Sequence, residues 1–203
     1  MAVLQLYLAD VREFAQQEQP ALSLLTPKRR ARAESIRVEQ DRLHCIGAGL
    51  LLRRVLNVTQ DWQLCDDGYG KLTLAGGPCF NLSHGGSYAV LAVFHAPVGV
   101  DVEPVGERVP AIPRRFLQPD ELAWLESDPT PERFARLWTR LESALKADGR
   151  GLAMESRAFS VLNSGAPWFI ETIAVEHHFI SCAAGESFEL QLNHLPAEEL
   201  LRW

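Results

Sequence analysis

The sequence VGVDVE at residues 98–103 is an apolar, β-branched run that two carboxylates interrupt, Asp101 and Glu103. If the run is a β-strand, side chains alternate between faces, so Val100 and Val102 enter a core and both carboxylates share the other face. Neighbouring carboxylates raise each other's pKa unless a positive charge lies between them. Mg²⁺ suits such a place, because it binds one or two protein carboxylates and keeps water and phosphate as its other ligands. The stretch predicts a divalent-cation site, with a solvated strand face as the alternative.

Length and composition bound the class of protein. The chain has 203 residues, 47% of them hydrophobic, which allows one large domain or two small ones with a substantial core. No apolar run has the length of a membrane span, and the N-terminus lacks the features of a signal peptide. We therefore expect a soluble, cytoplasmic protein with no membrane partner. Four cysteines without a CxxC pair argue against a zinc site and a disulfide framework.

The charge of the chain is acidic but uneven. A net charge of −6 argues against a general nucleic-acid-binding protein. Residues 28–37, KRRARAESIR, are nevertheless strongly basic and contain a single acidic side chain. A local basic patch on an acidic protein predicts a specific anionic ligand, and a solvated helix face is the alternative that stays open.

Turn signals, caps and apolar runs predict a mixed α+β fold. Thr26-Pro27 and Thr130-Pro131 each pair an N-cap with proline at the first helical position. The first pair opens a helical segment, broken once, that extends to about Asn57, and the second opens a helix to about Asp148. A short helix is expected at PDELAWLE. Strands are expected at residues 2–9, in YAVLAVFH and VGVDVEPV, which form a hairpin around Pro97, and in the later runs RAFSVL, PWFIETIAV, HHFISCAA and SFELQL.

The same plan of strand, helix and strands occurs in each half of the chain. We expect two similar α/β subdomains that meet near Pro97, with residues 1–97 in the first and residues 98–203 in the second. No sequence repeat between the halves is visible, so this division rests on the pattern of elements alone.

The helix predicted from Pro131 carries Glu142 and Lys146 four residues apart, at one edge of an apolar face. One interpretation is a surface ion pair. The other gives Glu142 to the metal as a third carboxylate and Lys146 to a phosphate. The apolar face itself consists of Phe134, Leu137, Trp138, Leu141 and Leu145.

Three motifs in order resemble those of the Sfp-type 4′-phosphopantetheinyl transferases. FNLSH at residues 80–84, GVDVE at residues 99–103 and WTRLESALKADGRGL at residues 138–152 are similar to the family patterns FNxSHS, GxDxE and WxxKExxxK with a glycine-rich turn. Gly70-Lys71 resembles a family element ahead of the first motif. The resemblance covers roughly residues 20–152.

The resemblance implies two α/β subdomains in a pseudo-twofold arrangement, with coenzyme A and Mg²⁺ (or Mn²⁺) in the cleft between them. A serine hydroxyl of an apo acyl or peptidyl carrier protein attacks the β-phosphate of coenzyme A, phosphopantetheine moves to the serine, and 3′,5′-adenosine bisphosphate leaves. It also implies a monomeric enzyme that serves fatty-acid, polyketide or nonribosomal-peptide biosynthesis.

Site residues follow from the same resemblance. Asp101, Glu103 and Glu142 are similar to the family's metal carboxylates, and Lys146 to its catalytic lysine on coenzyme A phosphate. Because three carboxylates overcompensate one dication, one of them is free to accept the serine proton, and Glu142 is the favoured acceptor. The expected contacts to coenzyme A are Arg29, Arg32, Lys71, Ser83, His84 and Lys146, with His84 at the 3′-phosphate. A register that uses Lys28 in the basic segment stays open.

The chain departs from the family pattern in three places. Leu141 stands at a family lysine, Gly85 at a frequent serine, and His44 at a common arginine, for which Arg42 is a candidate substitute. The loss of a lysine at 141 keeps a second function open, a coenzyme A or nucleotide-binding module or regulator that does not transfer. A Mg²⁺-dependent phosphohydrolase is a third.

The segment PRRFLQPDELAW at residues 113–124 is a candidate docking surface for the acidic helix of a carrier protein. It places Arg114, Arg115, Phe116 and Leu117 between the predicted metal strand and the helix from Pro131. An ordinary connecting segment with a buried Phe116 is the alternative.

Overall fold

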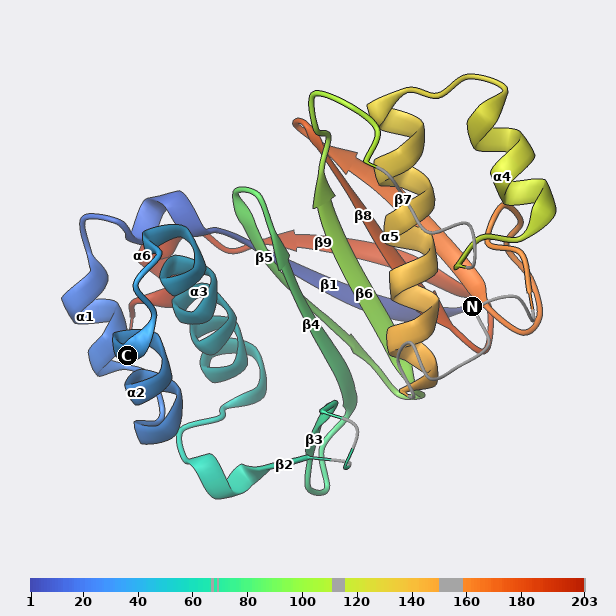
Figure 1. The fold of residues 1–203 in the computed structure, drawn as a ribbon. Helices are drawn as coiled ribbons and strands as arrows, with labels where there is room; N and C mark the ends of the chain where they lie inside the picture. Colours follow the sequence, from blue (N-terminus) through green and yellow to red (C-terminus); the bar gives the residue numbers. More distant parts are fainter. Residues whose placement is uncertain (67, 69, 111–115, 150–158, 203) are drawn as a thin grey trace.

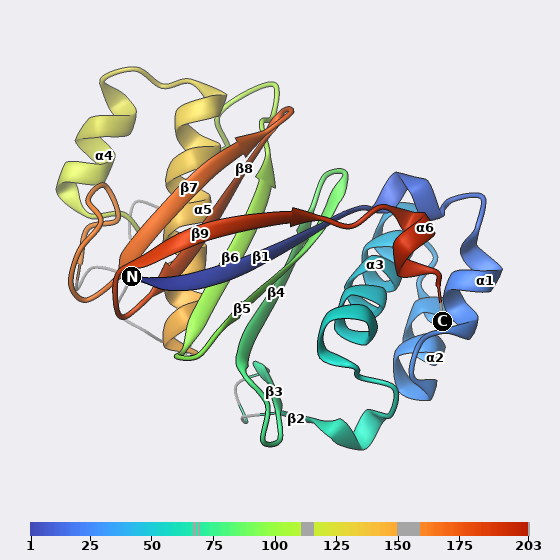
Figure 2. The ribbon, with the colours of Figure 1, turned by 180° about the vertical axis from the view of Figure 1, so that it is seen from behind.

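Two β-sheets lie face to face at the centre of the molecule, and helices cover their outer faces (Figures 1 and 2). The computed structural model describes residues 1–66, 68, 70–110, 116–149 and 159–202. The fold is mixed α+β, as the sequence predicts. In the described part of the chain, none of the helices is long and apolar enough to cross a membrane.

The first sheet has the strand order β4-β5-β1-β9, in which β1 is antiparallel to β5 and parallel to β9. The second sheet is antiparallel, with the order β6-β8-β7, and a small hairpin joins β2 to β3. The strands are β1 (Ala2–Asp10), β2 (Leu64–Asp66), β3 (Leu72–Leu74), β4 (Cys79–Gly85), β5 (Tyr88–Phe94), β6 (Val98–Pro104), β7 (Phe169–Val175), β8 (His178–Ala184) and β9 (Phe188–His194).

The helical predictions are confirmed, including the break in the first long segment. The chain is extended at Ile36 between α2 and α3, and the left-handed residue Asn57 ends α3. The Thr130 side chain caps α5, which ends before the left-handed Gly149. The helices are α1 (Glu18–Ser23), α2 (Pro27–Ser35), α3 (Glu39–Leu56), α4 (Pro119–Glu126), α5 (Pro131–Asp148) and α6 (Ala197–Leu200), with short 3₁₀ turns η1 (Val11–Phe14) and η2 (Asp61–Gln63).

The hairpin predicted around Pro97 is wrong. Both edges of β5 are taken by β1 and β4, whereas β6 pairs with β8 in the other sheet. Alternation of apolar residues identifies a strand and its faces, but it does not identify the neighbouring strand. The strand predicted at RAFSVL is also wrong over residues 159–162, which are irregular, while residues 157–158 lie outside the described part.

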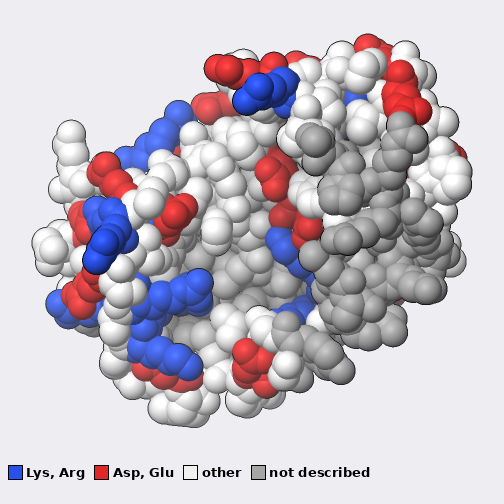
Figure 3. Space-filling model, viewed as in Figure 1, with Lys and Arg blue, Asp and Glu red and all other residues white. Residues whose placement is uncertain are grey.

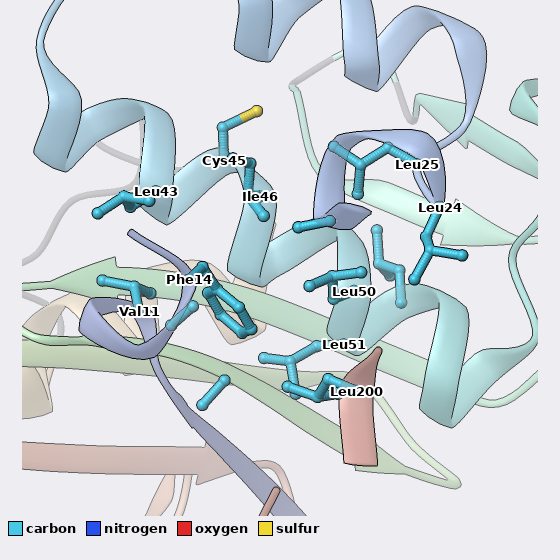
Figure 4. Close-up of a cluster of buried hydrophobic side chains, with 14 of the residues drawn as sticks. Val11, Phe14, Leu24, Leu25, Leu43, Cys45, Ile46, Leu50, Leu51 and Leu200 are labelled. Atoms are coloured by element: carbon cyan, nitrogen blue, oxygen red, sulfur yellow. The ribbon is translucent and has the colours of Figure 1, made fainter. Parts of the chain in front are cut away.

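Alternation along the strands produces three apolar layers. On β1, Leu4, Leu6 and Leu8 enter the core between the two sheets, whereas Tyr7 and Ala9 face the helices. The core between α3 and the first sheet includes Phe14, Leu50 and Leu51 (Figure 4). The third core lies between the second sheet and α5 and is built on Leu137, Leu141 and Leu145.

The order of elements recurs in the two halves. In the first half, β1 and α3 are followed by β4 and β5, and the three strands lie in the order β4-β5-β1. In the second half, β6 and α5 are followed by β7 and β8, and the three strands lie in the equivalent order β7-β8-β6. The chain then returns, because β9 pairs with β1 and α6 packs into the core beside α3. A division of the chain at Pro97 stays a prediction, and β9 and α6 pack with the first half although they follow Pro97 in sequence.

Helix α5 lies directly on the backbone of β6 at Gly99. A Cβ atom at Gly99 would lie 1.9 Å from the Ser143 carbonyl oxygen and 2.3 Å from the Ala147 nitrogen. These are backbone atoms inside a helix, which cannot move aside as a flexible side chain would. The absence of a side chain at position 99 therefore sets how closely α5 approaches the strand that carries Asp101.

We expect Gly99→Ala to lower the free energy of unfolding by about 3 kcal/mol, because the new methyl group overpacks this contact. Urea unfolding followed by circular dichroism measures the change. Gly185→Ala is the matched control, since a Cβ there meets no atom within 4 Å, and its effect should stay within about 0.5 kcal/mol. Equal midpoints for the two variants would contradict the close approach of α5 to β6.

Candidate functional site

The edges of the two sheets meet where β4 runs beside β6. The Val100 amide donates to Asn81 Oδ1 at 2.9 Å, and Ser83 Oγ donates to Asp101 Oδ1 at 2.8 Å. A Cβ at Gly85 would lie 2.3 Å from the Val102 carbonyl oxygen, so glycine replaces the family's frequent serine for a steric reason. Asn81 holds the two strands in register, a role that reasoning from the sequence missed although the residue lies in the FNLSH motif.

A cavity of about 310 Å³ opens at this junction, between β4, β6 and α5. Six of the nine predicted site residues line it, namely Ser83, His84, Asp101, Glu103, Glu142 and Lys146, together with Leu82 and Trp138. Figure 3 shows a hollow at the centre of this face, with acidic and basic side chains beside one another on its right-hand wall and a group of basic side chains on the left. The predicted residues from FNLSH, GVDVE and the α5 motif therefore meet in space.

Asp101 is the buried centre of the cluster, with 4% of its surface exposed. Its Oδ1 atom accepts a hydrogen bond of 2.6 Å from the Lys146 ammonium, and the same ammonium donates to Ser83 Oγ at 3.0 Å. Among the described residues, nothing hydrogen-bonds to the buried Oδ2 atom of Asp101. A buried carboxylate oxygen without a partner is costly, so this atom is directed at a place where a donor or a cation would be stabilising.

Two further carboxylates surround Asp101. Burial, followed by repulsion from Asp101 and Glu142, raises the pKa of Glu103 to about 7, although Lys146 acts in the opposite direction. Burial also raises the pKa of Glu142, with Lys146 opposing and Asp101 adding to the effect. Lys146 alone cannot neutralise three carboxylates. In the part of the chain that the structure describes, no three His, Cys, Asp or Glu side chains are drawn together closely enough to form a ready metal-binding group.

The two predicted phosphate-side residues of FNLSH occupy different environments. Ser83 is buried against Asp101, whereas His84 is exposed and its ring stacks on that of His44, with centroids 4.8 Å apart and planes inclined by 19°. Desolvation of the ring, and then the nearby His44 and Lys146, lower the pKa of His84. Ser83 therefore belongs to the carboxylate cluster, and His84 forms the opposite side of the cavity, toward α3.

The three remaining predicted residues lie outside the cavity. Arg32 is exposed on α2, close enough to contribute to the lowered pKa of His84. Arg29 is half-buried against α3, and burial lowers its pKa. The Lys71 ammonium donates to the carbonyl oxygens of Lys146, Val98 and Ala147 at 2.6, 3.1 and 3.2 Å. Lys71 thus satisfies carbonyl groups at the C-terminal end of α5, which a helix leaves unpaired.

The departures from the family pattern have visible consequences. Leu141 is 1% exposed in the third core, so no lysine could occupy this position without being buried. Arg42, the candidate substitute for the family arginine at position 44, is held elsewhere, because its guanidinium donates to Glu18 at 2.7 Å and to the Ile36 carbonyl oxygen at 3.1 Å. His44 itself is buried and stands directly beneath His84.

Trp138 was predicted as part of the apolar face of α5, but it also lines the cavity. Its ring stacks on Phe134 at 5.9 Å and meets Phe116 edge-on at 6.5 Å. Phe116 is half-buried and Leu117 is buried, while Arg114 and Arg115 lie outside the described residues. An aromatic surface therefore adjoins the carboxylate cluster on the side where the sequence predicts carrier docking.

Comparison with known proteins identifies the same family as the motifs. Residues 97–192 match the model of the 4′-phosphopantetheinyl transferase superfamily. The chain is 26% identical to the 4′-phosphopantetheinyl transferase Sfp of Bacillus subtilis strain 168 over 204 residues, which cover 89% of this chain and 91% of the relative.

Two further relatives are more similar over shorter stretches. A 4′-phosphopantetheinyl transferase of Bacillus subtilis is 33% identical over 152 residues, covering 66% of this chain and 68% of the relative. The 4′-phosphopantetheinyl transferase psf-1 of Bacillus pumilus is 30% identical over 161 residues, covering 74% and 68%. With its three motifs joined around one cavity, the chain belongs to the 4′-phosphopantetheinyl transferase superfamily.

Proposed function

We propose that this protein transfers 4′-phosphopantetheine from coenzyme A to a serine of an apo acyl or peptidyl carrier protein and releases 3′,5′-adenosine bisphosphate. The observation that carries the proposal is the convergence of Asp101, Glu103, Glu142 and Lys146 on one cavity between the two sheets. Membership of a family whose relatives bear this activity in their names supports it. A binding module without transfer is not favoured, because every acidic position of the motifs is filled and so is the second lysine of WxxKExxxK, Lys146, although Leu141 replaces the first.

The donor set fits a hard divalent cation. Among the described residues Asp101 has a buried oxygen without a partner, and burial together with the neighbouring carboxylates raises the pKa of Glu103 and of Glu142. Carboxylate oxygens are the ligands that Mg²⁺ prefers, and Mn²⁺ accepts the same set. We propose that Asp101, Glu103 and Glu142 hold Mg²⁺, which when bound would stabilise the negative charge of the reacting pyrophosphate.

The basic residues around the cavity provide the contacts to coenzyme A in this proposal. Lys146 places its ammonium at the cluster, where a phosphate oxygen of the ligand could compete with Asp101 for it. His84 lies on the other side with Arg32 nearby, which suits the 3′-phosphate. Arg29 and Ser83 are proposed as supporting contacts. Direct contact of Lys71 with the ligand stays a prediction, since its ammonium lies on the end of α5.

Transfer requires the carrier serine to lose a proton as its oxygen bonds to the β-phosphorus and the bond from that phosphorus to the bridging oxygen breaks. Phosphoryl transfer needs positioning and charge stabilisation more than covalent participation by the protein. Without a cation, burial raises the pKa of Glu142, so its carboxylate binds a proton more tightly than that of an ordinary glutamate. We propose Glu142 as the proton acceptor and Lys146 as the group that stabilises the developing charge.

Three further features belong to the proposal. The matching strand orders β4-β5-β1 and β7-β8-β6 support a pseudo-twofold relation between the halves. The aromatic surface of Phe116, Phe134 and Trp138 is the proposed place where the carrier approaches. We also propose that the protein acts as a monomer in the cytoplasm, where apo carrier proteins are made.

Intact mass spectrometry of an apo acyl carrier protein tests the function. After incubation with this protein, coenzyme A and Mg²⁺, the carrier should gain the mass of phosphopantetheine. Glu142→Gln should slow the transfer by about 100-fold or more, because it removes both a metal ligand and the proton acceptor. Glu132→Gln is the control on the same helix, since Glu132 is exposed in its first turn.

Two outcomes would overturn the proposal. Coenzyme A that binds without any mass gain across acyl and peptidyl carriers would indicate a binding module. Release of adenosine bisphosphate in the absence of a carrier would indicate a phosphohydrolase.

The raised pKa of Glu103 predicts how stability depends on pH when no metal is present. Between the pKa of an unfolded glutamate, 4.5, and the folded value of about 7, the folded state binds the extra proton. Stability should therefore fall as pH rises through this window and stay level above it. In Glu103→Gln this part of the fall should disappear. Urea unfolding in EDTA from pH 4.5 to 8 measures the free energy of unfolding of both proteins. Parallel curves against pH would show that the pKa of Glu103 does not differ between the folded and unfolded states.

A further inference from the structure

His44 is a buried histidine in the N-terminal half of α3, with 5% of its surface exposed, and the proposed chemistry does not use it. Its ring stands between the helix and the β4–β5 turn, where Nε2 lies 2.8 Å from the carbonyl oxygen of Gly86. The side-chain nitrogen of Gln40, one turn earlier, lies 2.6 Å from the same oxygen. Two side chains of α3 thus converge on one backbone carbonyl beside FNLSH.

This geometry indicates that the Nε2 atom of the ring carries a proton. A carbonyl oxygen only accepts hydrogen bonds, so the Nε2 atom of His44 carries a proton and donates it to Gly86. The Gln40 amide also donates to Gly86, which makes its 3.2 Å contact with His44 Nε2 an approach of two donors and not a bond. The imidazole is held in one orientation, with its flat face turned to His84.

The ring of His84 stacks on that flat face. His84 is exposed at the rim of the cavity, and its ring lies at 4.8 Å from His44, nearly parallel to it. In the described residues, no hydrogen bond of the His84 ring accompanies this stacking. The charged groups around His84 are Lys146 on α5, Arg32 on α2 and Asp41 on α3. An exposed imidazole with so few restraints would otherwise sample several rotamers.

We propose that His44 is a positioning residue that holds the His84 imidazole toward the cavity, and that it thereby sets the preference for a nucleotide ligand with a phosphate monoester over one with a free hydroxyl. The inference rests on the proposed function, in which that ligand is coenzyme A and the monoester is its 3′-phosphate. A ring that is already oriented loses less conformational entropy when it binds the phosphate. A dianion beside the ring favours its protonated form, which opposes the lowering of the pKa of His84 by burial.

The test compares two variants that both lose the hydrogen bond to Gly86. They differ in whether residue 44 still presents an aromatic ring to His84. His44→Phe keeps an aromatic ring beneath His84, whereas His44→Leu fills the space without one. Isothermal titration calorimetry gives the Kd of each protein for coenzyme A and for dephospho-coenzyme A, which lacks the 3′-phosphate. His95→Phe is the control, since His95 is exposed and pairs with Glu186.

We expect the preference of His44→Leu for coenzyme A over dephospho-coenzyme A to fall by about tenfold, the size of one hydrogen bond to a charged group. His44→Phe should keep the preference to within about threefold, because stacking persists, and affinity for dephospho-coenzyme A should be similar in all proteins. Should His44→Leu fail to fold, His44→Met supplies the same comparison.

Each other outcome has a distinct meaning. Equal losses for both ligands in His44→Leu would show a merely structural residue and overturn the inference. Equal preference in His44→Phe and His44→Leu would overturn the role of stacking. If the unmodified protein binds neither ligand, it is the proposed function that fails.

Discussion

The structure depends on how it accommodates one buried carboxylate, that of Asp101. Burying a charge is costly unless a partner of opposite charge and further hydrogen bonds compensate it. Asp101 lies on β6, its cationic partner Lys146 on α5 and its hydroxyl partner Ser83 on β4. Three elements that are distant in sequence therefore meet at one point.

The backbone makes this meeting possible. Gly99 lets α5 rest on β6, and Gly85 lets β6 approach β4, because a side chain at either position would collide with backbone. Lys71 supports the end of α5 from the other side of β6. The face of β6 toward α5 is an exception to this apolar packing, because it carries two carboxylates. In the described part of the chain, nothing hydrogen-bonds to one oxygen of Asp101. The same arrangement that orders the fold thus leaves excess negative charge in a cavity, and that charge is what supports the proposed metal and phosphate chemistry.

Much of this could be predicted from the sequence, because local rules decide it. Caps and apolar spacing predicted α5, one break was expected in the first long helical segment without a fixed position, and alternation predicted that Asp101 and Glu103 share a face. Strand partners could not be predicted in the same way, since a period of two assigns faces and not neighbours. The hairpin at Pro97 failed for this reason, and the pairing of β9 with β1 was not foreseen. The places of Lys71 and His44 depend on contacts between residues at least 27 positions apart, which no local pattern encodes.

Anomalous diffraction from crystals grown with Mn²⁺ and coenzyme A tests the central claim most directly, that the partnerless side of Asp101 is a cation site shared with Glu103 and Glu142. The account predicts one strong anomalous peak beside Asp101 Oδ2, from a Mn²⁺ ion toward which the carboxylates of Glu103 and Glu142 also turn. The Lys146 ammonium should then contact a phosphate oxygen of coenzyme A. A peak away from these carboxylates, or ligand density with no peak and Lys146 still on Asp101, would contradict it.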